Sequence, residues 1–125
     1  MKKEQRSPEA FLPLTPAVLH IMLALVDGER HGYSIMQEVT LRTDGKMRMG
    51  PGTLYGSIKR MMADGLIEES AERPDPALDD ERRRYYRLTN LGQRVIRTEV
   101  QRLEQIVHLA RSKQIVTGSE MMGGA

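Results

Sequence analysis

Residues 50–69, GPGTLYGSIKRMMADGLIEE, constrain the fold of this chain more than any other stretch. Their apolar side chains recur at the spacing of one helix face. These side chains are Leu54, Ile58, Met61 and Met62. Gly50-Pro51-Gly52 is a start signal, because proline in the first helical turn loses no needed N–H, and Asp64-Gly65 is a stop signal. Leu66-Ile67 then begins an apolar extended segment, so we predict a helix that leads directly into a β-hairpin.

The opposite side of this helix carries small, aromatic and basic side chains, and we expect all of them to be exposed. They are Thr53, Tyr55, Ser57, Lys59 and Arg60. No acidic residue occurs in the helix before Asp64, so this side can approach a phosphate backbone without electrostatic repulsion.

The charges are segregated along the chain, although the net charge is only +2 over 125 residues. Basic residues prevail from Arg42 to Arg60, where Asp44 is the only acidic residue. Acidic residues prevail from Asp64 to Glu81, and Arg82-Arg83-Arg84 follows at once. A uniformly solvated surface would not show this polarity, so the distribution of charge, rather than its sum, points to an anionic partner.

Several classes of function are disfavoured by what the sequence lacks. The chain has no cysteine, which excludes disulfides and thiolate sites. The histidines His20, His31 and His108 show no ligand spacing, and no glycine-rich phosphate loop occurs, so we expect no enzyme, metal or cofactor. The longest apolar run, residues 21–26, is too short for a membrane span, and no signal-peptide pattern follows the N-terminus. We therefore expect a cytoplasmic protein that does not contact membranes.

Two further helices are predicted before residue 50. Thr15 can cap the first helix and Pro16 can occupy its first turn, and residues 17–26 are apolar nearly all round, so this helix needs cover on more than one side. We interpret His20 there as a packed or interface residue rather than a ligand. The second helix runs from about Gly32 to Arg42. Its inward side is Ile35, Met36 and Val39. Three such helices are typical of a helix-turn-helix.

The candidate hairpin strands are residues 66–71 and 84–88. The residues between them include prolines and an acidic run, which suit an exposed loop. A β-ribbon directly after a recognition helix is the wing of a winged helix, so we predict a mainly α fold with a small β-hairpin (α+β). Two interpretations of Arg82, Arg83 and Arg84 stay open: contact with phosphates beside the helix, or pairing with the acidic residues next door.

A long helix is predicted after Thr89, which can cap it. Its apolar positions alternate steps of four and three, as in a coiled-coil seam. They are Ile96, Val100, Leu103, Val107 and Ala110, with charged flanks that include Arg97, Glu99, Arg102, Glu104 and Arg111. The seam can pack on the first helix of the same chain or on a second copy. A helix of about 24 residues extends roughly 36 Å, more than a small core covers, so we favour dimerisation.

Five short motifs, in order, resemble the PadR family of winged-helix transcriptional regulators. They are Leu14-Thr15-Pro16, His31-Gly32-Tyr33, Gly52-Thr53-Leu54-Tyr55, Asp64-Gly65-Leu66-Ile67 and Tyr85-Tyr86-Arg87-Leu88-Thr89, with Leu91-Gly92 beyond. The short C-terminus is similar to the subfamily with a single C-terminal helix. The resemblance implies a homodimeric repressor of an inverted-repeat, double-stranded DNA operator, with a small-molecule effector of unknown identity as a further candidate partner.

The resemblance also implies roles for particular residues. Thr53 and Tyr55 would lie at the start of the recognition helix against DNA, and the arginines before Tyr85 would belong to the wing. Family wings commonly carry glycine and basic residues at the tip, whereas residues 74–81 here contain prolines and acidic residues. Because an acidic tip would be repelled from the minor groove, we do not expect the tip itself to insert there. The expected organisation is a flexible arm at 1–13, a DNA-binding domain at 14–88, a dimerisation helix at 89–113 and a disordered tail at 114–125. A winged-helix module that binds proteins without specific DNA binding is the alternative.

Overall fold

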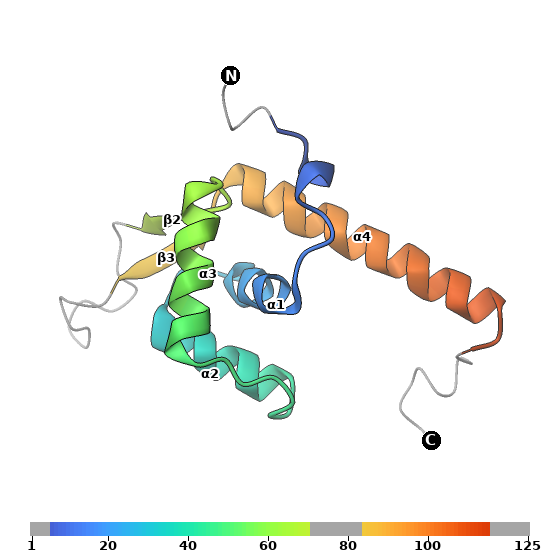
Figure 1. The fold of residues 1–125 in the computed structure, drawn as a ribbon, viewed down its shortest axis with the longest axis horizontal. Helices are drawn as coiled ribbons and strands as arrows, with labels where there is room; N and C mark the ends of the chain where they lie inside the picture. Colours follow the sequence, from blue (N-terminus) through green and yellow to red (C-terminus); the bar gives the residue numbers. More distant parts are fainter. Residues whose placement is uncertain (1–5, 71–83, 116–125) are drawn as a thin grey trace.

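The computed structural model describes residues 6–70 and 84–115, which form a winged helix (Figure 1). The elements in chain order are the 3-10 helix η2 (Pro8–Phe11), α1 (Pro16–Leu25), β1 (Arg30–His31), α2 (Gly32–Arg42), α3 (Pro51–Ala63), β2 (Ile67–Ser70), β3 (Tyr85–Leu88) and α4 (Asn90–Ser112). The predicted fold class, mainly α with a small β-hairpin and a long C-terminal helix, is confirmed.

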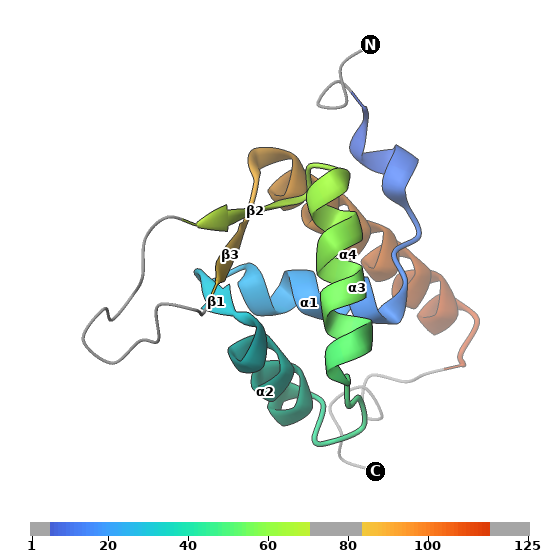
Figure 2. The same cartoon turned by 60° about the vertical axis from the view of Figure 1, so that its left-hand side comes forward.

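Helix α1 lies at the centre, with α2, α3 and α4 around it (Figures 1 and 2). Thr15 caps it as expected, since its hydroxyl accepts a hydrogen bond from the Val18 N–H at 3.2 Å. Ile21 and Met22 have no exposed surface. The expectation that this helix needs cover on more than one side is therefore confirmed, and its burial supplies the core of the domain.

The sheet has three antiparallel strands in the order β1-β3-β2. Ile67 of β2 faces Leu88 of β3, and Arg30 of β1 faces Tyr86 of β3. The hairpin was predicted, with strands one or two residues longer than the described ones. Strand β1 was not predicted, because two residues are too few to show an alternating pattern.

Helix α3 begins and ends where the sequence predicts, but its buried stripe differs by one residue. Leu54, Ile58 and Met61 are buried, whereas Met62 is 39% exposed, so its assignment to the core face is wrong. Ser57, only 2% exposed, completes the stripe instead. On a helix, position 57 lies one turn from both Leu54 and Met61, inside the apolar sector, whereas position 62 is turned a further 100° away from Met61.

The N-terminal segment is more ordered than the sequence suggests. The expectation of a flexible arm over residues 1–13 is wrong for residues 8–11, which form η2, while residues 1–5 lie outside the described part. Phe11, Leu12 and Leu14 pack against the core. These apolar residues follow a polar stretch, and their burial against the distant helix α4 could not be read from local pattern.

Glu99 of α4 fixes this segment from the other end of the chain. Its side chain is only 1% exposed. It accepts a hydrogen bond from the Leu14 N–H at 2.9 Å and is paired with Arg102 at 2.6 Å. The placement of Glu99 on a solvated flank of the helix is therefore wrong. Val95 and Ile96 of α4 pack in the same hydrophobic core as α1, and Glu99 is buried as well. The division of the chain into a DNA-binding domain at 14–88 and a dimerisation helix at 89–113 stays a prediction.

Glu99 makes stability depend on pH. The hydrogen bond from Arg102 lowers the pKa of Glu99, burial opposes this, and the Leu14 N–H lowers it further. A carboxyl whose pKa is lower in the folded than in the unfolded chain stabilises the fold above its unfolded pKa of about 4.3, and this contribution is lost as pH falls through the folded pKa. Urea unfolding as a function of pH should therefore show a smaller acid-induced loss of stability for Glu99→Gln than for the wild type. The exposed Glu104→Gln serves as control, and equal pH dependence in wild type and Glu99→Gln would contradict this account.

Candidate nucleic-acid interface

The outer face of α3 matches the sequence expectation at four of its five positions. Thr53, Tyr55, Lys59 and Arg60 are exposed, and Tyr55 retains 47% of its accessible surface. Within residues 6–70 and 84–115, neither Lys59 nor Arg60 has an ion-pair partner. Their two positive charges are therefore available to an external anion.

Ser57 is the exception. Its side chain faces the core beside Leu54 and Ile58, so its assignment as a contact with base edges or phosphates is wrong. A serine gives no strong periodic signal of its own, because small polar residues occur on both buried and exposed helix faces. The candidate nucleic-acid interface on α3 is thus Thr53, Tyr55, Lys59 and Arg60.

The outermost line of α3 is narrow. A Cβ atom built at Gly52 or Gly56 would meet no atom of the described chain within 4 Å, so neither glycine is required by packing inside the protein. Both lie on the side of the helix opposite Leu54, between the flanking side chains of Thr53 and Lys59. The backbone of α3 can therefore approach a groove closely along this line.

Among the described residues of the wing, both arginines have acidic partners. Arg84 is 68% exposed but pairs with Glu69 of β2 at 3.1 Å, and Arg87 pairs with Glu68 at 2.9 Å. Such exposed pairs stabilise the fold little and can exchange for an external anion. Arg82, Arg83 and the acidic stretch 74–81 lie outside the described residues, so their two interpretations stay open.

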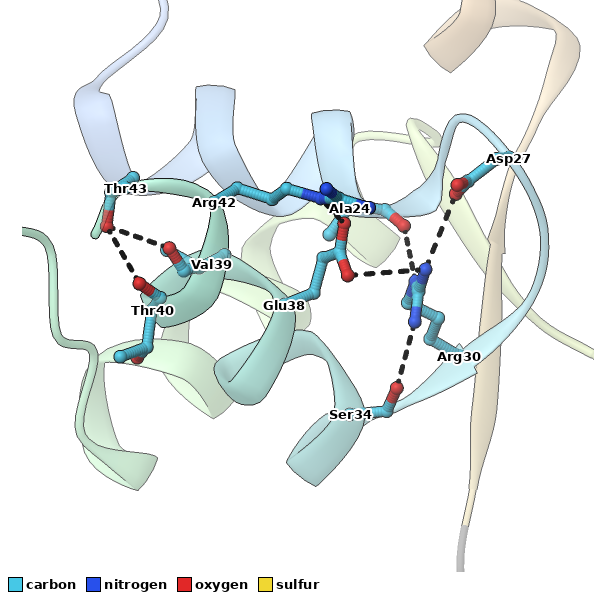
Figure 3. Close-up of polar contacts among 9 residues, drawn as sticks. All are labelled: Ala24, Asp27, Arg30, Ser34, Glu38, Val39, Thr40, Arg42 and Thr43. Atoms are coloured by element: carbon cyan, nitrogen blue, oxygen red, sulfur yellow. Dashed lines mark hydrogen bonds and ion pairs between the residues drawn. The ribbon is translucent and has the colours of Figure 1, made fainter. Parts of the chain in front are cut away.

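An ion network that sequence reasoning missed fixes α1 against α2 (Figure 3). Arg30 Nε donates to the carbonyl oxygen of Ala24 at 2.7 Å, near the end of α1, and its Nη1 donates to Ser34 Oγ at 3.1 Å. Its Nη2 lies 3.6 Å from a carboxylate oxygen of Glu38 and 3.7 Å from one of Asp27. Ser34 and Glu38 lie four residues apart on one side of α2, and Arg30 of β1 precedes them by a further four residues. This spacing was the sequence signal for the network.

The beginning of α2 is held by His31. Its Nδ1 accepts a hydrogen bond from the Ser34 N–H at 3.2 Å. Its ring packs edge-on against the ring of Tyr85 in the wing, with the two ring centroids 5.3 Å apart. The cap and the ring contact together join α2 to β3. The first helix of the helix-turn-helix therefore has a fixed position relative to the wing.

The proposed dimer seam on α4 is partly covered by its own chain. Ile96 is buried in the core, so its assignment to the seam is wrong for the single chain. Leu103 and Ala110 are half-buried, whereas Val100 and Val107 are 38% and 37% exposed. The C-terminal half of α4 extends past the core in Figure 1.

A groove of about 520 Å³ lies between α1 and α4. Its apolar lining includes Leu23 of α1, Val26 just after α1 and Val100 of α4, with Arg97 and Glu104 among its polar residues. Leu23 and Val26 are exposed next to the buried residues Ala24 and Leu25. The groove therefore joins exposed apolar side chains at the end of α1 to Val100 of the seam.

Neither a metal nor a membrane site emerges from the described residues. Across residues 6–70 and 84–115, no group of three or more histidine, aspartate or glutamate side chains is arranged to hold a metal ion. Within the same ranges, no helix has both the length and the apolar character needed to cross a membrane.

The fold and the exposed face of α3 define a winged helix, a class in which a helix and an adjacent β-hairpin form one surface. The chain belongs to the transcriptional regulator PadR-like family, whose model matches residues 18–98. The family resemblance seen in the sequence is therefore confirmed. Family membership also places the chain among transcriptional regulators rather than enzymes.

Individual relatives agree with this assignment. The chain is 35% identical over 88 residues to the transcriptional regulator Rv3488 of Mycobacterium tuberculosis, a match that covers 70% of this chain and 76% of the relative. Its fold is similar to that of a PadR family transcription regulator from Clostridium difficile R20291, with a TM-score of 0.65, 24% identity, and coverage of 80% of this chain and 99% of the other. Bacillus subtilis PadR, solved in complex with operator DNA, has a TM-score of 0.57, 19% identity, and coverage of 70% and 48%.

Proposed function

We propose that the chain is a sequence-specific, double-stranded DNA-binding regulator that acts in the cytoplasm as a homodimeric repressor of an inverted-repeat operator. The observation that carries the proposal is the outer face of α3, where Lys59 and Arg60 are exposed without acidic partners among the described residues. The family membership and the solved complex of Bacillus subtilis PadR with operator DNA support it.

In this proposal α3 lies in the major groove. Lys59 and Arg60 contact phosphates and contribute most of the salt-dependent affinity. Thr53 and Tyr55, nearer the start of the helix, contact base edges, and the Tyr55 ring can pack on a thymine methyl group. The outward line at Gly52 and Gly56 allows the helix backbone to come close to the groove.

The proposed homodimer forms through α4. Leu103, Val107 and Ala110 lie in the C-terminal half of α4. This half of the helix extends past the core in Figure 1. A partner helix that packs on this seam and on Leu23 and Val26 at the end of α1 would remove exposed apolar surface from water. The two copies of α3 would then enter successive major grooves about 34 Å apart, and the operator would share the two-fold symmetry of the protein.

The groove between α1 and α4 is the proposed effector site. A ligand bound there would contact both the DNA-binding part and the dimerisation helix. Because a change in the angle between α1 and α4 changes the distance between the two copies of α3, such a ligand would shift operator affinity.

The first test is the double variant Lys59→Ala with Arg60→Ala. A dimer would lose four phosphate contacts at about 0.9 each, so the slope of log affinity against log salt should become shallower by about 3.6. Fluorescence anisotropy with an operator duplex across a salt series measures this. The variant Arg94→Ala with Lys113→Ala removes the same charge from exposed positions on and just after α4, and its slope should match the wild type. An unchanged slope in the Lys59/Arg60 variant would contradict the proposed docking and favour a protein-interaction module.

The second test addresses the dimer. Leu103→Glu places a charge in the seam and should convert dimers to monomers, because a buried unpaired carboxylate is strongly unfavourable. Light scattering coupled to size-exclusion chromatography measures the mass directly. Gln105→Glu adds the same charge to an exposed residue on the opposite side of α4 and should leave the dimer intact. A dimer that survives Leu103→Glu would rule out this seam.

A further inference from the structure

Two motifs that are distant in sequence meet at one contact. Helix α2 begins at Gly32, which is buried, and α3 carries Tyr55. A Cβ atom added at Gly32 would lie 2.3 Å from the Tyr55 hydroxyl oxygen and 2.7 Å from Cζ. Real Cβ atoms essentially never come within 3.0 Å of another atom in this way. The hydroxyl end of the Tyr55 ring, with Cζ and Cε1 behind it, therefore occupies the space that any side chain at position 32 would need.

Backbone conformation does not explain the glycine. The glycines with positive φ are Gly28, Gly45 and Gly65, and Gly32 is not among them. Its backbone is that of an ordinary first helical residue, which alanine adopts readily. The contact with Tyr55 is the remaining structural reason for a glycine at this position.

The Tyr55 ring lies where three elements meet. One edge rests on the start of α2, while 47% of its surface is exposed. Burial raises the pKa of Tyr86 on β3, with smaller contributions from Glu69 and then Tyr55, so the Tyr55 hydroxyl is within electrostatic range of the wing. Figure 2 shows the start of α2 directly beside the strands β1 and β3. The His31 cap and its contact with Tyr85 hold the same corner in place.

We propose that Gly32 is a positioning residue for DNA recognition: it supports the Tyr55 ring in one orientation at the edge of the recognition helix. The inference rests on the proposed function of the α3 face. An exposed tyrosine on a helix otherwise samples more than one χ1 rotamer, and ordering it on binding costs free energy. With one edge of the ring on Gly32, the open part of the ring is presented to the operator before DNA arrives.

A double-mutant cycle in operator affinity tests this coupling. Gly32→Ala displaces the ring and should weaken operator binding by about tenfold, an ordinary loss for one side-chain contact with DNA. Tyr55→Ala should weaken it at least as much. The combination should bind no more weakly than Tyr55→Ala alone, within about twofold, because the added methyl group then displaces nothing. Tyr55→Phe keeps the ring edge on Gly32 and should retain most of the affinity.

Thermal unfolding provides the readout that separates positioning from damage to the fold. In the Tyr55→Ala background, Gly32→Ala should leave the melting temperature unchanged or raise it, since alanine favours the helix. The proposal would be overturned if the double variant lost as much binding free energy as the two single variants together. Full operator affinity in Gly32→Ala would also overturn it.

A measurement without DNA distinguishes failure of this inference from failure of the proposed function. In NMR spectra of the full chain, nuclear Overhauser effects are expected between the Tyr55 ring protons and the two Hα protons of Gly32. In Gly32→Ala the ring is displaced, so no such effect should be seen between the Tyr55 ring protons and the single Hα proton of the alanine. Their absence in the wild type would overturn the positioning role even if operator binding is tight. Their presence in a protein that binds no specific DNA would overturn the role in recognition and the proposed function together.

Discussion

The burial of α1 is the constraint on which the other elements depend. Ile21 and Met22 have no exposed surface, and α2, α3 and α4 surround them (Figure 1). Both ends of α1 are fixed by polar contacts with other parts of the chain: the Ala24 carbonyl oxygen accepts from Arg30, six residues further on, and the Leu14 N–H before the helix donates to Glu99 of α4. A displacement of α1 would therefore move α3 and α4 together.

This arrangement relates the core to the proposed function. Helix α3 packs on α1 with Leu54, Ile58 and Met61, so its outer face is presented rigidly. The buried carboxylate Glu99 joins α4 to the segment before α1, and it does so in the same helix that carries the seam. A regulator that reads DNA with one helix and pairs through another needs such a rigid connection, because half-site spacing depends on the angle between them.

The parts of the fold with local signals were predictable from sequence. The caps at Thr15 and Thr89, the proline at the start of α3 and the turn at Asp64-Gly65 are all where expected, since each depends on neighbours within a few residues. The buried Glu99 was not predictable in this way, because its partner Leu14 is 85 residues away in sequence. Charge alone places a glutamate on the surface unless a specific partner is known.

In the candidate interface, too, the features with local sequence signals were predictable and those that depend on distant neighbours were not. Lys59 and Arg60 could be assigned from periodicity and charge, whereas Ser57 could not be told from an exposed residue without its packing neighbours. The contact between Gly32 and Tyr55 joins two helices and leaves no local mark in either motif. Sequence patterns thus identified which face of α3 is exposed. The structure was needed to say which side chains on that face are held in position.

Binding of the full chain to duplexes selected from its own genome tests the central claim most directly. After several rounds of selection, fluorescence anisotropy compares the recovered duplex with a scrambled duplex of the same composition across a salt series. We expect the selection to recover an inverted-repeat sequence that the chain binds about a thousandfold or more tightly than the scrambled control, with affinity that falls steeply as salt increases. Equal, weak binding to both duplexes, with no enriched sequence, would contradict this expectation.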